Sequence, residues 1–334
     1  MKISISFATI RYGWLENTFR CLGQQTLPHN EWKLIMIDDT PEDRSEQVIE
    51  LAKKENINIK WMRSKKNYWK FNRMLGNARN TGFVHSDGEL IVFLDDYTWI
   101  PPTFLEEHWK IYKQTKNAVI GRVKAVTYKD NIKDSSELEV IGEDNRYEQI
   151  LSKGNSYLQD APYAWFYTFN SSAPLANIIK INGFDEEFDC TGEDDIDLGE
   201  RLSRIGTKFT YRTHSGITIF HTQHGKNIIV KCNNCNANLG EYHCWYDRNT
   251  CPNCKTPVNM HDINKMIRFN ITPRYKENDV HKVTKDLYGT KYEGSWGLLE
   301  RNKRKNPWNV NNGYFNLSDA RKNRDFYPYK EYKI

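Results

Sequence analysis

The stretch ELIVFLDD (residues 89–96) is an apolar run that ends abruptly at two aspartates. A short apolar run of this kind is typical of a strand. Helix-like segments flank it at 71–86 and 101–115, and the second begins with two prolines, which suit the first turn of a helix. The pattern predicts a strand over 89–95 that lies between two helices of an α/β sheet.

The same alternation continues in both directions from this stretch. We expect further strands at 3–9, 32–38, 57–62 and 118–126, and further helices at 14–25 and 42–55. Strands that alternate with helices indicate an α/β fold with a mostly parallel sheet flanked by helices. In such sheets ligands bind beyond the carboxyl ends of the strands, where Asp38 and Asp39, and also Asp95 and Asp96, fall.

The second part of the chain gives a weaker pattern. Residues 127–160 are polar and irregular, which predicts a loop or a weakly ordered insert. From residue 161 the chain becomes aromatic (APYAWFYTFN, 161–170), and a last strand is expected at 216–225 (GITIFHTQHG). We therefore expect the α/β domain to occupy residues 1–225.

An acidic stretch, GEDDIDLGERLSRIG (192–206), follows the aromatic one. Leu198, Leu202 and Ile205 recur at helical spacing, so a helix with one apolar face is predicted. Acids in its first turn are favourable near the positive end of the helix dipole. Adjacent Asp194 and Asp195, however, raise each other's pKa by repulsion, which is a property that general bases and metal sites use. A solvated helix end and a functional site both remain open at this point.

Four of the seven cysteines form two pairs, CNNC (232–235) and CPNC (251–254). This spacing is typical of a zinc ribbon with four thiolates and no open position, so the ion would be structural. The predicted ligands are Cys232, Cys235, Cys251 and Cys254. His243 and Cys244 lie between the pairs and could compete as ligands. We expect this ribbon at 226–260, where it either contacts nucleic acid or only stabilises a loop.

The formal net charge of +5 is concentrated near the C-terminus. Residues 300–334 hold nine basic and four acidic side chains, interleaved with aromatic residues. We expect a C-terminal extension at 261–334, which either meets a phosphate polymer or wraps its aromatic side chains onto the body. The chain shows no signal-peptide pattern and no apolar run of about 18 residues. The expected location is therefore cytoplasmic, which would be the host cytoplasm for a viral protein.

Several stretches, in this order, resemble the GT-A glycosyltransferases of family 2. They are ISFATIRYGWLENTFRCLGQQTLP, LIMIDDTPED, GNARNTGFVHSDGELIVFLDDYTWIP, NGFDEEF followed by GEDDIDLGERL, and IFHTQH. The resemblance implies the GT-A fold and the transfer of a sugar from a nucleoside diphosphate, for example UDP, to an acceptor hydroxyl. It also implies a divalent cation, Mn2+ or Mg2+, that neutralises the diphosphate leaving group.

The resemblance assigns roles to individual residues. Asp96 takes the place of the metal-binding aspartate, and Asp95 faces the ribose or the metal. Leu94 stands where the family often has another aspartate, so either carboxylate could carry the cation. His221 matches the late metal-ligand histidine, and His224 is a nearby second candidate.

The nucleotide and the acceptor have their own implied residues. Thr9, Arg11, Asp38, Asp39 and Arg79 fall where the family binds the nucleotide. Asp195 takes the place of the general base in an inverting reaction, and Asp194 would hold the acceptor. Asp197 and Glu200 are expected to be structural charges of the helix.

The acceptor is open between two classes. One is a glycan hydroxyl, and the other is a hydroxylated base in DNA, as in some phage genomes, which the ribbon and the basic aromatic tail would favour. A different hypothesis is a non-catalytic nucleic-acid-binding protein built on a degenerate GT-A fold. Asp96, Asp195 and His221 together favour the enzyme.

Overall fold

The structure is a computed structural model of the 334-residue chain. It describes residues 1–9, 15–38, 43–64, 75–127, 132–186, 188, 194–222, 229–231, 234–235, 238–241, 253–254, 303, 306–311 and 315–324. The chain divides into two compact units, one formed by Met1–His221 with Gly294–Ile334 and the other by Thr222–Glu293.

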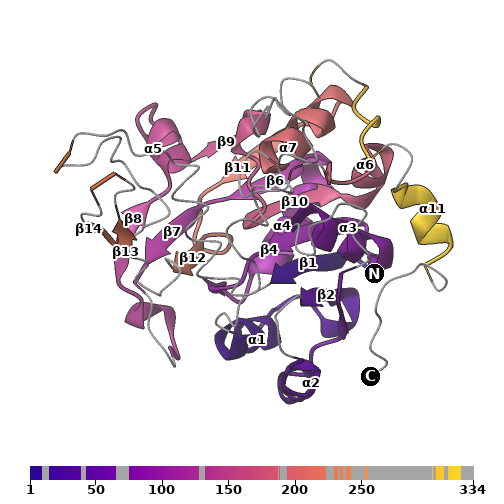
Figure 1. The fold of residues 1–334 in the computed structure, drawn as a ribbon, viewed down its shortest axis with the longest axis horizontal. Helices are drawn as coiled ribbons and strands as arrows, with labels where there is room; N and C mark the ends of the chain where they lie inside the picture. Colours follow the sequence, from indigo (N-terminus) through magenta and orange to yellow (C-terminus); the bar gives the residue numbers. More distant parts are fainter. Residues whose placement is uncertain are drawn as a thin grey trace. The chain divides into compact units, whose positions relative to one another are not determined.

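An eight-stranded sheet forms the centre of the first unit (Figure 1). Its order is β3 (Ile59–Met62), β2 (Trp32–Asp38), β1 (Ile3–Thr9), β4 (Leu90–Leu94), β10 (Asn170–Pro174), β6 (Ala118–Gly121), β11 (Phe209–Arg212) and β9 (Tyr157–Leu158). The predicted strands at 3–9, 32–38, 57–62 and 89–95 are all present, and the first two have the predicted bounds.

The sheet is mixed, which corrects the prediction of a mostly parallel one. The strands β3, β2, β1 and β4 are parallel, whereas β10 is antiparallel to both β4 and β6, and β9 is antiparallel to β11. Asn170 at the start of β10 pairs with Leu94 at the end of β4. The segment that leads into β10 therefore reaches the sheet at the edge where β4 ends, which matters for the site.

A smaller four-stranded sheet has the order β5 (Thr98–Trp99), β12 (Ile219–Thr222), β7 (Val123–Val126) and β8 (Val140–Glu143). The single strand predicted at 118–126 is in fact two strands, because the chain leaves the large sheet as β6 and enters the small one as β7. The expected loop at 127–160 is also wrong in part. It contains β8, β9 and the helix α5 (Asn145–Leu151), which begins where Asp144 accepts a hydrogen bond from the backbone N–H of Arg146.

Helices cover both faces of the large sheet (Figure 1). One core joins the sheet to α1 (Leu15–Gly23), α2 (Ser45–Lys54) and α4 (Phe104–Thr115), and the other joins it to α3 (Leu75–His85), α6 (Leu175–Lys180), α7 (Asp194–Arg204) and α11 (Leu317–Lys322). Short 3-10 helices are η1 (His29–Glu31), η2 (Ser135–Glu137) and η3 (Tyr163–Trp165). Along β4, Leu90, Val92 and Leu94 enter the first core, and Ile91 and Phe93 enter the second. The predicted strand is thus buried on both faces.

The described part of the C-terminal segment packs on the first unit. Phe315 and Leu317 are buried in the second core together with Ala320 of α11. Trp308, by contrast, is 52% exposed. Of these two aromatic side chains only Phe315 packs on the body, so the role of the extension stays a prediction.

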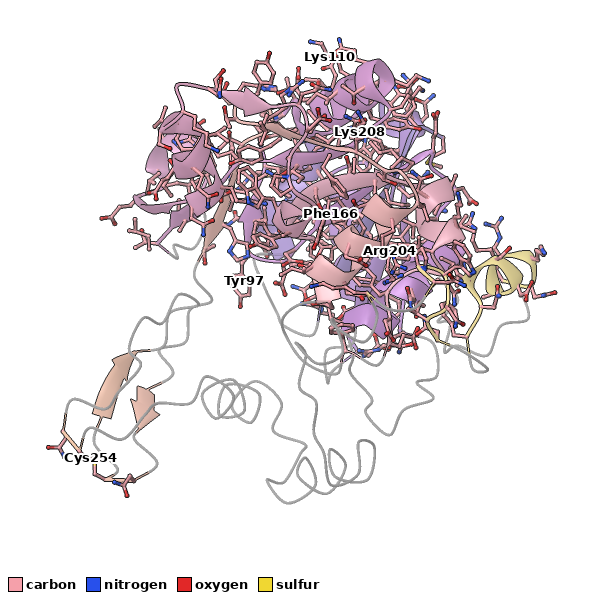
Figure 2. The ribbon with its side chains drawn as sticks, turned by 90° about the horizontal axis from the view of Figure 1, so that it is seen from above. Tyr97, Lys110, Phe166, Arg204, Lys208 and Cys254 are labelled. Carbon is pink, nitrogen blue, oxygen red and sulfur yellow. The ribbon has the colours of Figure 1, made fainter. Side chains whose placement is uncertain are left out.

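The second unit contains a two-stranded antiparallel hairpin of β13 (Ile229–Lys231) and β14 (Asn238–Glu241). Cys235 lies between these strands in sequence, and the side-chain amide of Asn253 donates a hydrogen bond to its Sγ at 3.4 Å. Asn253 precedes Cys254, which lies beside the hairpin in Figure 2. Cys235 therefore lies next to the described part of the second cysteine motif. No described helix has the length and apolar content needed to cross a bilayer.

Candidate functional site

Three neighbouring strands end together at one edge of the large sheet. Thr9 at the end of β1 pairs with Asp38 at the end of β2, and Phe7 pairs with Leu94 at the end of β4. The acidic pairs therefore begin at the same carboxyl edge, as predicted for a ligand site in an α/β sheet. The hydroxyl of Thr9 donates to Asp96 Oδ2 at 2.8 Å, which joins the first of these strands to the turn after the third.

The carboxylate of Asp38 is fully buried at this edge. Arg44 Nε donates to its Oδ2 at 2.6 Å, and Trp61 Nε1 donates to the same oxygen at 3.2 Å. Arg63 donates to its backbone carbonyl at 2.6 Å. Asp38 thus fixes the end of β2, and a contact between its side chain and a nucleotide stays a prediction that would require this ion pair to open.

The turn after β4 presents the two aspartates differently. Asp96 is almost fully buried beside Thr9, whereas the side chain of Asp95 is 26% exposed. Tyr97 follows with φ of 59°, in the left-handed region that an aromatic residue rarely adopts. Backbone strain of this kind gathers at functional sites, where the surrounding structure holds it in place. Asp95 is therefore the more accessible carboxylate of the pair.

Pairing of β5 with β12 brings the predicted histidine to this turn. His221 pairs with Thr98, two residues after Asp96 in the chain. Its imidazole ring also lies 6.0 Å, centroid to centroid, from the ring of Phe169. Within the described ranges no three His, Cys, Asp or Glu side chains are grouped closely enough to hold a metal ion by themselves.

Arg79 of α3 connects the turn after β4 to the acidic helix. Its Nη1 donates to Asp195 Oδ1 at 3.1 Å and to Asp194 Oδ2 at 3.2 Å, and its Nη2 lies 3.5 Å from Asp95 Oδ1. The guanidinium is buried and lies 5.2 Å from the centroid of the Phe184 ring. Burial alone would lower the pKa of Arg79, but the three carboxylates outweigh burial and raise it.

The two aspartates at the start of α7 have different surroundings. Asp194 is buried, and burial together with the charge of Asp195 raises its pKa well above the usual value, although Arg79 opposes the rise. The side chain of Asp195 is 21% exposed. Its carboxylate accepts hydrogen bonds from Thr168, from the hydroxyl at 2.6 Å and from the backbone N–H at 3.1 Å. Asp195 is therefore both oriented and accessible, as a general base must be.

The remaining acids of the helix are structural, as expected. Asp197 is fully buried and accepts a hydrogen bond from Arg201 at 2.7 Å. Arg201 in turn donates to the carbonyls of Ile181 and Gly183. Glu200 forms a longer ion pair with Arg204 at 3.7 Å. The Asp197–Arg201 pair thereby ties α7 to the turn that precedes it.

Two asparagines that sequence reasoning missed hold that turn. Asn80 accepts from the backbone N–H of Phe184 at 2.8 Å and donates to Glu186 Oε1 at 2.8 Å. Asn311, from the C-terminal segment, donates to the carbonyl of Phe184 at 2.7 Å and accepts from the N–H of Glu186 at 2.8 Å. Gly183 has φ of 70°, and a Cβ there would meet Asn80 Oδ1 at 2.3 Å. The sequence motif NGFDE is therefore a clamped turn, which fixes the chain before the acidic helix.

Thr168 was also missed, because a threonine inside an aromatic run carries no catalytic signal.

Other predicted residues lie outside the described part of the chain. They are Arg11, Asp39, His224, Cys232, His243, Cys244 and Cys251.

Part of the chain is similar to proteins of a known family. Residues 8–172 match the sequence profile of Glycosyl transferase family 2. Among curated proteins, validoxylamine A glucosyltransferase from Streptomyces hygroscopicus subsp. jinggangensis (strain 5008) is 26% identical over 250 residues, which cover 67% of this chain and 57% of the relative. Hyaluronan synthase from Pasteurella multocida is 25% identical over 232 residues, which cover 63% of this chain and 23% of the relative.

The chain spans a little more than half the length of the validoxylamine A glucosyltransferases that it matches. Among solved structures, S. aureus TarS 1-349 in complex with UDP-GlcNAc aligns with a TM-score of 0.49 at 15% identity, over 68% of this chain and 60% of that chain. The family match begins in β1 and ends in β10, and it includes Thr9, Arg79, Asp95, Asp96 and Thr168. The chain therefore carries a glycosyl transferase family 2 domain at residues 8–172, within the α/β fold described above.

Proposed function

We propose that the chain is a metal-dependent, inverting glycosyltransferase that moves a sugar from a nucleoside diphosphate to an acceptor hydroxyl. The observation that carries the proposal is the contact of Arg79 with Asp95 on one side and with Asp194 and Asp195 on the other. Two motifs that are far apart in the sequence, the stretch with Arg79 and Asp95 and the start of α7, meet there at the edge of the sheet where ligands bind. The names of the relatives, a glucosyltransferase and a hyaluronan synthase, support the transfer of a sugar.

The donor would lie across the carboxyl ends of β1, β2 and β4. Thr9, Asp38, Arg79 and Asp95, together with Arg11 and Asp39, are the residues proposed to contact the nucleotide. In this proposal Arg79 has two roles. Its positive charge attracts the nucleotide, and its hydrogen bonds position Asp95 and the start of the acidic helix. It keeps three carboxylates in place close to a ligand that is itself anionic.

The residues at the turn after β4 fit a divalent cation such as Mn2+ or Mg2+. Carboxylate oxygens and an imidazole are suitable ligands, and Asp96 and His221 are proposed to hold the ion, with Asp95 beside them. Such ions are commonly held by one or two carboxylates together with substrate phosphates rather than by an all-protein cage. This accounts for the lack of a preassembled three-ligand group in the described ranges. When bound, the ion would offset the negative charge of the diphosphate leaving group.

Asp195 is proposed as the general base. Thr168 fixes its carboxylate through two hydrogen bonds, and Arg79 holds it through one more. The carboxylate would take the proton from the acceptor hydroxyl as that oxygen attacks the anomeric carbon. A single displacement of this kind inverts the anomeric centre. Asp194, beside it at the start of α7, would hold the acceptor.

We also propose that Cys232, Cys235, Cys251 and Cys254 hold a structural Zn2+ in a ribbon within 226–260. The hairpin of β13 and β14 and the hydrogen bond from Asn253 to Cys235 support it, because they bring Cys235 next to a residue of the CPNC motif. Four thiolates leave no open position for chemistry. The ion would stabilise this part of the chain, separately from the sugar-transfer site in 1–225 and from the extension in 261–334.

A donor assay tests the proposed function. The purified chain is incubated with UDP-glucose, UDP-N-acetylglucosamine and GDP-mannose, with and without Mn2+, and slow release of free sugar and nucleotide is measured. We expect release from at least one donor, which a chelator abolishes. Asp160→Asn, an exposed carboxylate that pairs with Lys208 at 3.7 Å, is the matched control and should release the same amount. A folded protein that binds and cleaves none of these donors, or that cleaves them fully in excess chelator, would contradict the proposal.

A further inference from the structure

The aromatic run before β10 alternates between buried and partly exposed side chains. Phe166, Thr168 and Asn170 are buried, whereas Tyr167 and Phe169 between them are partly exposed. β10 starts opposite the end of β4, so this segment lies at the carboxyl edge of the sheet. The proposed mechanism uses Thr168 alone from this run. The two partly exposed rings, which we name the aromatic platform, have no role in it.

The aromatic platform adjoins the reacting groups on two sides. Thr168 lies between its two members in sequence and donates to Asp195 from both its hydroxyl and its backbone N–H. On the other side, the Phe169 ring lies 6.0 Å from the His221 ring. The centroids of Tyr167 and Phe169 are themselves 5.7 Å apart, with the ring planes inclined by 36°. The platform therefore links the proposed base to the proposed metal ligand.

A buried arginine supports both rings. Arg146 Cζ lies 4.8 Å from the centroid of Tyr167 and 5.5 Å from that of Phe169. Asp144 holds the guanidinium through Nε at 2.8 and 2.9 Å, and the carbonyl of Trp165 accepts from Nη1 at 2.6 Å. The rings are thus fixed before any ligand arrives, which reduces the entropy that binding would cost.

Burial raises the pKa of the Tyr167 phenol, an effect that Arg146 opposes and that the charges of Asp144 and Asp195 reinforce. The phenol is therefore within electrostatic reach of the proposed base, and it stays neutral at physiological pH. A neutral hydroxyl on a fixed ring can orient a polar ligand beside Asp195 by hydrogen bonding. This combination of an apolar surface with a few placed polar groups is typical of small-molecule sites.

We infer that the aromatic platform is the acceptor subsite and that the acceptor is a sugar ring, which stacks on Tyr167 and Phe169. The inference rests on the proposed function and names its acceptor class. One face of a pyranose is a patch of C–H groups, which are weakly positive and pack on the negative face of an aromatic ring. Its hydroxyls project at the edge of the ring, where one of them can meet Asp195.

Charge at the platform favours a neutral sugar over a nucleic acid. Among the described residues, Arg146, which contacts both rings, is already paired with Asp144. Beyond the platform lie the carboxylates of Asp194 and Asp195. Nucleic-acid binding draws most of its affinity from cations that neutralise phosphates, and a paired arginine beside carboxylates does not provide that.

The test measures acceptor binding to the full chain loaded with UDP and Mn2+. The probes are methyl glucosides, galactosides and N-acetylglucosaminides, the disaccharides cellobiose and lactose, and a single-stranded DNA that contains 5-hydroxymethylcytosine. Saturation-transfer NMR reports which protons of a probe touch the protein. The variants are Tyr167→Leu and Phe169→Leu, which keep apolar volume but remove a ring. Tyr157→Leu, at an exposed tyrosine that packs against Arg212, is the matched control.

We expect at least one sugar probe to bind through the C–H groups of one face. Removal of either ring should weaken that binding about tenfold or more, which corresponds to the contribution of one good ring contact. UDP affinity by calorimetry and the melting temperature should be close to wild type, and Tyr157→Leu should bind the sugar normally. The inference is overturned if UDP binds but no sugar does, if both ring variants bind sugar as wild type does, or if the DNA binds in place of the sugars. If neither UDP nor any donor binds, the result would instead contradict the proposed function, and this inference would fall with it.

Discussion

Arg79 Nη1 lies 3.1 Å from Asp195 Oδ1. Arg79 belongs to the segment that matches the family, residues 8–172, whereas Asp195 follows that segment in the sequence. The same guanidinium reaches Asp194 and Asp95. The contacts with Asp194 and Asp195 join residues more than 100 positions apart in the chain, and together with the contact to Asp95 they define the site more sharply than any single motif.

Replacement of Arg79 by methionine removes the common partner of these carboxylates. We expect the free energy of unfolding to fall by about 3–5 kcal/mol, the usual effect of breaking a buried ion pair and leaving its partners uncompensated. Arg79→Lys keeps the charge but not the forked geometry of the guanidinium. It should retain a larger fraction of the wild-type stability than of the wild-type activity. Urea denaturation and donor cleavage, measured on both variants, check this. An Arg79→Met protein with wild-type stability and wild-type activity would contradict the role given to Arg79.

The buried pair of Asp197 and Arg201 predicts a stability defect rather than a catalytic one. Asp197→Asn leaves the Arg201 guanidinium buried without a countercharge, and should destabilise the fold by about 3–5 kcal/mol. Glu200→Gln, which affects a longer pair with a partly exposed arginine, should cost less than about 1 kcal/mol. Denaturation curves for the two variants decide the matter. Equal stabilities for both would show that Asp197 is not a structural anchor of α7.

A buried histidine makes stability depend on pH. His108 of α4 is fully buried between Ser172 and Asn170, and burial lowers its pKa to about 3. Between pH 6.5 and about pH 3 this histidine binds a proton in the unfolded chain but not in the folded chain. The free energy of unfolding therefore has its full value above pH 6.5 and decreases as the pH falls below it. From pH 7.5 to pH 5 the loss at one such group is about 2 kcal/mol.

The variant His108→Gln removes this titration. It should be less stable than wild type at pH 7.5, and the difference in unfolding free energy should shrink by about 2 kcal/mol at pH 5. Thermal and denaturant unfolding at both pH values measure it. A difference that does not change with pH would mean that His108 is not held neutral by burial.

The zinc proposal makes a prediction about metal content. Elemental analysis should find one zinc per chain in wild type, and Cys235→Ser should release it and lower the stability of the second unit. Cys21→Ser is the matched control, because Cys21 lies in the core of the first unit and burial raises its pKa to about 11. That variant should keep its zinc. An unchanged zinc content in Cys235→Ser, or no zinc in the wild-type protein, would contradict the proposal of a zinc ribbon.

The parallel half of the sheet was predictable because each strand there is a short segment rich in apolar residues that alternates with a helical segment. β1 and β2 have the predicted bounds, and β4 alternates between two cores as a doubly buried strand should. The division of 118–126 into β6 and β7 was not predictable, since both halves have strand-like residues and only tertiary pairing separates them. Helix α5 was missed because most of its side chains are exposed or polar, so no apolar stripe marks it.

Prediction of the site succeeded where chemistry is local and failed where partners are distant. Two adjacent aspartates at the end of an apolar run, or at the start of a helix, are visible in the sequence. The bond from Thr168 to Asp195 spans 27 positions, and the clamp of Asn311 on Phe184 spans 127. No periodicity records such contacts, because they arise only when the sheet and its loops are assembled.

The most direct test of the account concerns Asp195. Asp195→Asn keeps the size of the side chain and removes its capacity to take a proton. Donor affinity is measured by calorimetry with Mn2+, and transfer is measured by mass spectrometry of products from pooled glycans and DNA that contains 5-hydroxymethylcytosine, with Asp160→Asn as control. We predict donor affinity near wild type and transfer lowered by about a hundredfold or more. A folded Asp195→Asn protein that binds donor and transfers sugar at the wild-type rate would contradict the assignment of Asp195 as the base.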